Sequence, residues 1–383
     1  MLPSAEPRAV WLDVVRFVAF LLLLGCHATD PINAAATYGA STEPLSTADI
    51  TWAAFWGAFV RPCVPLFVML TGALLLPVQS GMRQFYARRI PRVVWPFLIW
   101  SVTYYLTPWL TGLLGAEKNI VPYLFSWAES DSQALSDGLR LMVQIPFNFP
   151  YMVSHLWYIY LLVGLYLYMP IFSAWVGRAT QREKQWVLAV WGISLCVPYV
   201  TEFLTPYAFG TCSWNSFGTF YYFAGFNGYL LLGHYVAHYV RLSIPLTWVV
   251  AVLLMGIGLP VSYFGYQAMV ALLQPTPEQV ELFWTYCTPN VAMMSLAWML
   301  LLKRTNVRSA AVRNALKHLT LCGFGIYMVH YFFVRPCHDL VGLLGLPTPL
   351  NIPMAAVLML AVTWSLVWLL RRVLGRYARI LLG

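Results

Sequence analysis

The sequence predicts an all-α, polytopic membrane protein with about ten transmembrane helices and with both termini in the cytoplasm. Composition predicts the class: 60% of the 383 residues are hydrophobic and only 10% are charged, whereas roughly a quarter of the residues of a soluble domain are charged. Fourteen acidic residues cannot cover the surface of a soluble chain of this length. The distribution of charge along the chain predicts the orientation.

Ten segments are predominantly apolar over about 20 residues, the length that a helix needs to cross a bilayer. They are 10–28, 52–77, 93–114, 155–173, 186–203, 218–238, 245–264, 283–302, 317–334 and 352–370. The first segment lacks the features of a cleaved signal peptide, so we expect it to be retained. Without an internal repeat or a hydrophilic region of domain size, we expect a single membrane domain over 1–383 with no appended soluble domain.

The loops between these segments divide the charge unequally. With the N-terminus in the cytoplasm, the cytoplasmic segments hold 18 Lys and Arg against two Glu, a net charge of +16. The outer loops hold three basic and eleven acidic residues, a net charge of −8. Asp13, Arg16 and Arg61 lie inside predicted spans and complete the net charge of +9. Because Lys and Arg collect in cytoplasmic loops, this division supports both the count and the orientation. The excess of Lys and Arg in the cytoplasmic segments also accounts for the net charge of +9, so no nucleic-acid partner is needed to explain it.

The first span carries Asp13, Arg16 and His27, and ionisable residues inside a span indicate function. At 100° per residue the three lie on one stripe, with Arg16 near the cytoplasmic end and His27 about 16 Å away near the outer end. Imidazole can take a proton from a hydroxyl, and a guanidinium can hold an anion or polarise a carbonyl. Asp13 can orient Arg16. The alternative is an internal Asp13–Arg16 ion pair and an interfacial His27.

Arg61 is the remaining charge at membrane depth, in the segment VRPCVP at 60–65. Two prolines within four residues distort a helix, and irregular backbone inside a membrane is found beside protein or a watery cavity. We therefore expect Arg61 to line a cavity, where it either binds substrate or pairs with Asp13.

His155 and His330 stand near the outer ends of two further spans, at the depth of His27. Each either contacts substrate or packs through hydrogen bonds. Three histidines at one depth suit zinc in principle, but no ligand spacing supports a metal and we expect none.

A basic cluster, FYARRIPR at 85–92, lies at the cytoplasmic end of the third span and contains Arg88, Arg89 and Arg92. Two explanations fit this cluster equally well. One is the general bias of positive charge toward the cytoplasm, and the other is docking of a polyanionic nucleotide through charge-assisted contacts.

Taken in order, these motifs resemble the membrane-bound acyltransferase family 3, in particular its integral-membrane O-acetyltransferases of surface polysaccharides. The family's mark, LDxxR with a His eleven residues after the Arg, matches LDVVR at 12–16 and His27. Its other motifs match VPLFVMLTG at 64–72, with Thr71 where Ser is usual, then FxxxRxxR from Phe85, HLWY at 155–158 and GIYMVH at 325–330. The resemblance covers nearly the whole chain.

The resemblance implies transfer of an acyl group, commonly acetyl from cytoplasmic acetyl-coenzyme A, to a hydroxyl of a glycan or glycolipid at the outer face of a bacterial cytoplasmic membrane. His27 would be the catalytic general base or an acyl relay, and Arg16, beside Asp13, would bind the donor. We assign Arg61, Arg88, Arg89 and Arg92 to the donor side. The acceptor side would be lined by His155, Trp157, Tyr158, Tyr327 and His330. Acyl-coenzyme A would be a co-substrate, with no permanently bound cofactor.

Two other classes of function compete with the enzyme. A transporter or flippase for a glycan or acylated intermediate would also use charges that line a cavity. A structural subunit is disfavoured, since inert spans have little use for Asp13, Arg16 and Arg61. For the enzyme, the residues leave open whether the acyl group passes directly to the acceptor or through an acyl-His27 intermediate.

Overall fold

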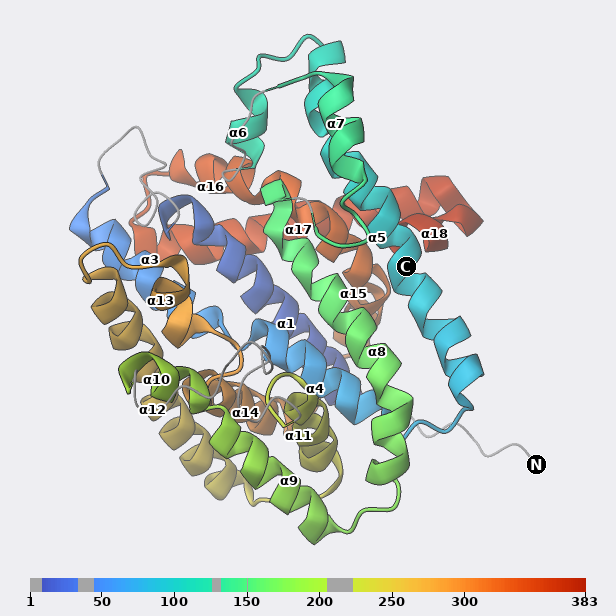
Figure 1. The fold of residues 1–383 in the computed structure, drawn as a ribbon, viewed down its shortest axis with the longest axis vertical. Coiled ribbons are helices and arrows are strands. Elements are labelled where there is room, and N and C mark those ends of the chain that lie inside the picture. The colour runs from blue at the N-terminus through green and yellow to red at the C-terminus, as the bar shows by residue number, and fades with distance from the viewer. Residues whose placement is uncertain (1–8, 34–44, 126–131, 150, 205–222) are drawn as a thin grey trace. The chain divides into compact units, whose positions relative to one another are not determined.

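The structure, a computed structural model, describes residues 9–33, 45–125, 132–149, 151–204 and 223–383 (Figure 1). These ranges form α-helices and short 3-10 helices and contain no strand, which confirms the all-α class. The chain divides into two compact units. Unit 1 comprises Met1–Leu23, Ala54–Pro77 and Phe172–Thr320, and unit 2 comprises Leu24–Ala53, Val78–Ile171 and Leu321–Gly383.

Seven helical segments among the described residues are long and apolar enough to cross a membrane. They are Val10–Asn33, Thr47–Leu75, Val153–Val176, Gln181–Phe203, Ile244–Val270, Pro277–Lys303 and Thr348–Leu382. Each overlaps one of the predicted spans. The chain is therefore a polytopic membrane protein.

The three other predicted spans fall on helices that are shorter or more polar. Segment 93–114 lies in α5 (Met82–Leu113), which is rich in Trp, Tyr, Thr and Pro. Segment 218–238 overlaps α11 (Asn227–His238) and begins outside the described residues. Segment 317–334 overlaps α15 (Ala310–Val329), whose first turns are charged, and the 3-10 helix η3 (His330–Phe333). The count of ten stays a prediction.

In unit 1, α4 (Cys63–Leu75) and α11 cross at very short range. A Cβ atom at Gly72 of α4 would clash with the backbone of Leu230, and one at Gly233 of α11 would clash with the backbone of Met69. Each helix thus presents a glycine to the other's main chain. Such small residues allow close helix packing in membranes.

The helix α12 (Ile244–Val270) packs extensively against α14 (Pro289–Lys303) in the same unit. Its buried side is mostly small or polar: Thr247, Ala251, Gly258 and Ser262. Its exposed side is apolar: Trp248, Val249, Val252, Leu253, Ile257 and Phe264. A soluble helix has the reverse pattern, so this outer face suits contact with lipid.

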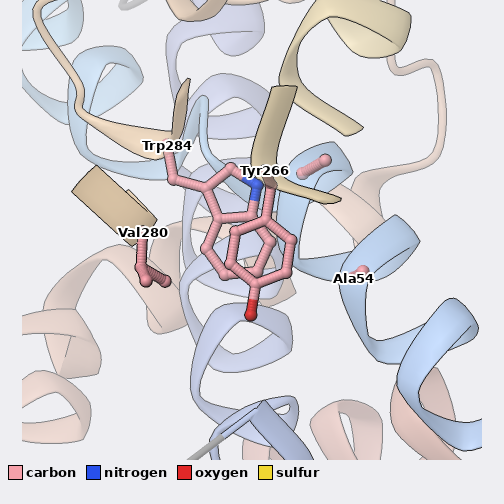
Figure 2. Packing of buried hydrophobic residues seen from close by; sticks show 5 residues of the cluster. Ala54, Tyr266, Val280 and Trp284 are labelled. Atoms are coloured by element: carbon pink, nitrogen blue, oxygen red, sulfur yellow. The ribbon is translucent and has the colours of Figure 1, made fainter. Parts of the chain in front are cut away.

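An aromatic stack anchors a hydrophobic cluster of unit 1 beside α12 (Figure 2). The rings of Tyr266 and Trp284 lie 3.6 Å apart and within 4° of parallel. Trp284 ends the 3-10 helix η2 (Leu282–Trp284), which follows α13 (Pro277–Glu281). Ala54 and Ala58 of α3 (Thr47–Val60) complete the cluster with Val280. The stack joins η2 to α12.

A buried polar network ties together α14, α12 and α10 (Val197–Phe203), the helix after α9 (Gln181–Ser194). The Asn290 side chain donates to the Ser262 hydroxyl at 2.7 Å and to the Phe283 carbonyl at 2.8 Å, and it accepts from the Tyr199 hydroxyl at 2.5 Å. Buried polar groups require such partners, so this network is structural.

Lys303 stabilises the end of α11. Its ammonium donates to the carbonyls of Val236, Ala237 and Val240 at 2.6, 3.0 and 2.8 Å. The last carbonyls of a helix lack intrahelical partners and carry partial negative charge.

We expect Lys303→Met, which keeps the length but removes all three donors, to destabilise the protein by about 1–3 kcal/mol. Thermal unfolding in detergent measures the change. Lys317→Met, at an exposed position of α15, is the matched control. Equal unfolding temperatures for the two variants would contradict the role of Lys303.

Unit 2 contains the remaining helices. These are the short helices α6 (Ile120–Leu124) and α7 (Leu135–Met142), then η1 (Tyr151–Leu156), α8 (Trp157–Val176) up to Ile171, α16 (Val334–Gly342), α17 (Thr348–Leu374), η4 (Gly375–Tyr377) and α18 (Ala378–Leu382). The helices α7 and α18 pack on α5, and α16 packs on α17 (Figure 1).

The position of η3 is set by aromatic packing in unit 2. The Tyr104 ring stacks on Phe332 at 4.6 Å, and the Tyr104 hydroxyl donates to the Met328 carbonyl at 2.6 Å. Phe125, directly after α6, packs edge-on against Phe332 at 5.3 Å. These contacts hold the residues that follow α15.

Candidate active site

Helix α1 (Val10–Ala28) is one continuous helix that carries Asp13, Arg16 and His27, as predicted. In unit 1, Arg16 Nη1 lies 3.4 Å from Asp13 Oδ1. The same Nη1 donates to the hydroxyl of Thr320 on α15 at 3.1 Å, and that hydroxyl donates to Asp13 Oδ1 at 3.0 Å. The carboxylate is buried and the Arg16 side chain is 19% exposed. Asp13 and Arg16 thus form the ion pair that the sequence offered as an alternative, and the Thr320 hydroxyl contacts both of them.

His27 lies near the C-terminal end of α1, in unit 2, against an acidic partner. Its Nδ1 is 2.7 Å from Oδ2 of Asp30, one turn further along the chain. A carboxylate only accepts hydrogen bonds, so Nδ1 carries the proton in this contact. The lone pair of the neutral ring is then on Nε2, the nitrogen that can accept a proton from another group.

Two further imidazoles lie beside His27 in unit 2. The ring centre of His330 is 5.0 Å from that of His27, and the ring centre of His155 is 6.3 Å from it. His155 and His330 are 4.8 Å apart. Tyr331 stacks on His155 at 4.8 Å and meets the edge of His27 at 5.3 Å. The structure therefore brings together the three histidines that the sequence placed at one depth.

The histidines beside His27 have buried nitrogens without partners. His330 Nδ1 contacts the Tyr327 carbonyl at 2.7 Å, so this nitrogen holds the proton and Nε2 is an acceptor. Neither His330 Nε2 nor either ring nitrogen of His155 has a hydrogen-bond partner among the described residues. An unsatisfied buried polar group costs about 1–3 kcal/mol. Departures from the rule that buried polar groups are hydrogen-bonded are expected at functional or strained sites.

The predicted acceptor-side aromatic residues form a series of ring contacts that begins at His155. The Tyr327 hydroxyl donates to the His155 carbonyl, and the two rings are 5.3 Å apart. Tyr158 meets Tyr327 at 5.9 Å, and Trp157 meets Tyr158 at 6.1 Å. All five acceptor-side candidates therefore lie in unit 2.

Arg61 lies in the break between α3 and α4, in unit 1. The two prolines of this segment interrupt the helix there, as predicted. The guanidinium stands 4.2 Å above the Trp284 ring, and Nε donates to the Gly57 carbonyl at 3.2 Å. A cation over the face of a tryptophan is held by electrostatic attraction. Its use in substrate binding stays a prediction.

Arg88, Arg89 and Arg92 occupy the first turns of α5 in unit 2. Arg88 and Arg92 are exposed, and Arg89 is half-buried. No acidic residue is close enough to pair with them in the part of the chain that the structure describes. Their charge is thus not neutralised within the described protein, which suits binding of an anion.

A family model described as an acyltransferase domain, that of acyltransferase family 3, matches residues 9–368. The chain belongs to acyltransferase family 3. No curated protein and no solved structure matches it significantly. The matched range contains every candidate discussed above, from Asp13 to His330.

As a member of acyltransferase family 3, the protein is a membrane enzyme that takes an acyl group from a donor and passes it to an acceptor. Such a reaction needs a base for the accepting group and a group that holds the donor. His27 with Asp30 has the geometry of a base and its orienting carboxylate, and Arg16 has the charge to hold an anion.

Among the described residues of this acyltransferase, no group of three or more His, Cys, Asp and Glu side chains is arranged to hold a metal ion. His27, His155 and His330 lie close together, yet their contacts are with Asp30, with aromatic rings and with a main-chain carbonyl.

Three residues that contact the candidate residues were not predicted from the sequence: Thr320 beside Arg16 in unit 1, and Asp30 and Tyr331 beside His27 in unit 2. Asp30 counted only as a charge of an outer loop, although its place three residues after His27 is the spacing of helix neighbours. Tyr331 follows His330 and had no separate signal. Thr320 had none either, because it is 304 positions from Arg16 along the chain.

Proposed function

We propose that this enzyme moves an acyl group, acetyl in the simplest case, from cytoplasmic acyl-coenzyme A to a hydroxyl of a cell-surface glycan or glycolipid. The transfer would take place at the outer face of a bacterial cytoplasmic membrane. The contact of His27 Nδ1 with Asp30 Oδ2 at 2.7 Å carries the proposal, because an imidazole oriented by a carboxylate is the arrangement that removes a proton from a hydroxyl.

In the direct mechanism, His27 Nε2 takes the proton of the acceptor hydroxyl while the oxygen attacks the thioester carbonyl carbon. The carbon–sulfur bond breaks, the ester forms, and the imidazolium returns the proton to the coenzyme A thiolate. In the relay mechanism, Nε2 attacks the carbonyl carbon, the carbon–sulfur bond breaks, and coenzyme A leaves as the thiolate. The acceptor oxygen then attacks the acyl-imidazolium, the carbon–nitrogen bond breaks, and the hydroxyl proton passes to the thiolate, which leaves the ester, the free thiol and neutral His27. Asp30 stabilises the positive charge of the ring in both.

The donor side would use the arginines. Coenzyme A carries several phosphate charges, and guanidinium groups bind phosphates through charge-assisted hydrogen bonds. The exposed positions of Arg88 and Arg92 support docking of these phosphates, with Arg89 and Arg61 as further donor-side residues. Arg16, on the same helix as His27, would hold the acyl thioester end of the donor.

The acceptor side would use the residues around His27. A hydroxyl both donates and accepts hydrogen bonds, so it can satisfy the partnerless nitrogens of His155 and His330. Tyr158, Tyr327 and Trp157 would contact the remainder of the acceptor.

Purified protein in proteoliposomes tests the proposal. With acetyl-coenzyme A on one side and an oligosaccharide acceptor on the other, we expect release of free coenzyme A thiol in amounts equal to the acetylated oligosaccharide. Release should depend on the acceptor and require acetyl-coenzyme A on the side that bears the Arg88 cluster. Passage of unmodified oligosaccharide or donor across the membrane, with no thiol released, would instead indicate transport and overturn the proposal.

A further inference from the structure

We infer that Thr320 is a positioning residue, which orients the Arg16 guanidinium for the acyl donor. The inference rests on the proposed role of Arg16 in donor binding. It starts from the three-way contact of Thr320, Arg16 and Asp13 in unit 1.

The Thr320 hydroxyl makes the two shorter contacts of this group. It accepts from Arg16 Nη1 at 3.1 Å and donates to Asp13 Oδ1 at 3.0 Å, whereas Nη1 is 3.4 Å from the carboxylate. A hydroxyl has one proton to donate and lone pairs to accept with, so both contacts form together. At 3.4 Å, the direct contact of Nη1 with the carboxylate is longer than the 2.7–2.9 Å typical of charge-assisted bonds. Thr320 therefore fixes the position of the guanidinium through a hydrogen bond to Nη1.

Thr320 adds what Asp13 cannot supply. Asp13 and Arg16 are three residues apart on α1, so their contact joins two residues of the same helix. Thr320 belongs to α15 and attaches it to a second. A guanidinium is planar, so a fixed Nη1 fixes the directions of its other N–H groups. An arginine side chain is otherwise flexible, and ordering it before the donor arrives removes part of the entropy cost of binding.

A purely structural role makes a different prediction. Asp13 is only 3% exposed, and a buried carboxylate requires hydrogen-bond partners. If Thr320 served only to satisfy Asp13, its loss would lower stability and leave the affinity for the donor unchanged. If Thr320 positions Arg16, donor affinity changes selectively.

The experiment compares Thr320→Val, Thr320→Ser and Thr363→Val. Valine keeps the shape of threonine without the hydroxyl, and serine keeps the hydroxyl. Thr363 is a buried threonine of α17 whose hydroxyl donates to the carbonyls of Met359 and Leu360 in its own helix, so it is the matched control. The measurements are the Kd of a non-transferable thioether analogue of acetyl-coenzyme A, KM and kcat with acetyl-coenzyme A, and the unfolding temperature.

We expect Thr320→Val to raise Kd and KM about tenfold, the effect of one hydrogen bond to a charged group, with kcat within about twofold to threefold. Thr320→Ser should restore Kd to within about twofold, and Thr363→Val should leave Kd unchanged. If Thr320→Val does not fold, Thr320→Cys replaces it with the same expected loss, because a thiol is only a weak hydrogen-bonding group.

Wild-type donor affinity in folded Thr320→Val would overturn the inference, and so would equal weakening in Thr320→Ser. The variant Arg16→Ala separates this result from the proposed function. If Arg16→Ala weakens binding of the analogue while Thr320→Val does not, only the inference fails. If Arg16→Ala binds the analogue normally, the proposed donor role of Arg16 fails.

Discussion

Replacement of His27 by alanine is expected to lower the rate of acyl transfer by about 10²–10⁴-fold, the usual contribution of a positioned general base. The methyl group can neither take the acceptor proton nor carry the acyl group, so the loss is expected for the direct and the relay mechanism alike. His27→Gln should be equally impaired, because its amide can contact Asp30 but cannot accept a proton from a hydroxyl. The rates of thiol release and of product formation measure both variants.

His238→Ala is the control for His27. This histidine is exposed at the end of α11, where Nδ1 contacts the His234 carbonyl at 2.9 Å, and its replacement should keep wild-type activity. Matched unfolding temperatures establish that the variants are folded. Wild-type turnover in folded His27→Ala would falsify the assignment of this residue as base or relay.

Asp30→Asn is expected to lower kcat by about 10²-fold or more, with a small change in KM. Asparagine has the size of aspartate but offers an amide N–H group. If that group donates to His27 Nδ1, the ring proton moves to Nε2, which then has no lone pair for the acceptor hydroxyl. The neutral amide also no longer stabilises the imidazolium. Steady-state kinetics with acetyl-coenzyme A measure the effect.

Asp339→Asn is the matched control for Asp30, since Asp339 of α16 also contacts a histidine, His338, at 3.2 Å. It is partly exposed, pairs with Arg335 at 3.1 Å and has no proposed role in transfer. We expect its kcat within about twofold of wild type. Equal kcat values for Asp30→Asn and Asp339→Asn would show that the carboxylate beside His27 does not matter for catalysis.

The residues of α1 illustrate which part of the site is readable from sequence. Asp13, Arg16 and His27 belong to one helix, and helix geometry alone places them on one stripe. The contact of Asp30 with His27 was equally local, and its three-residue spacing would have predicted it had the helical turn been extended past residue 28. Local spacing along the chain is therefore enough to predict contacts within the first helix and with the residues directly after it.

Other parts of the site depend on residues far apart in the chain. Thr320 meets Arg16 across 304 positions, and Trp284 meets Arg61 only because α13 and η2 pack against α3 and α12. His155 and His330 were placed at one depth by topology, but depth alone does not say whether two helices are neighbours. The spacing of residues along the chain does not predict contacts between helices that are far apart in sequence.

The apolar content and the uneven division of Lys and Arg sufficed for the membrane class, and the ordered motifs from Asp13 to His330 sufficed for the resemblance to an acyltransferase. Both depend on composition and on short-range spacing, which a chain displays before it folds. The clustering of His27, His155 and His330 and the hold of Thr320 on Arg16 came from helix packing. Packing is governed by the shapes of whole faces, such as the glycines that let α4 and α11 approach, and it joins residues whose sequence positions carry no common signal.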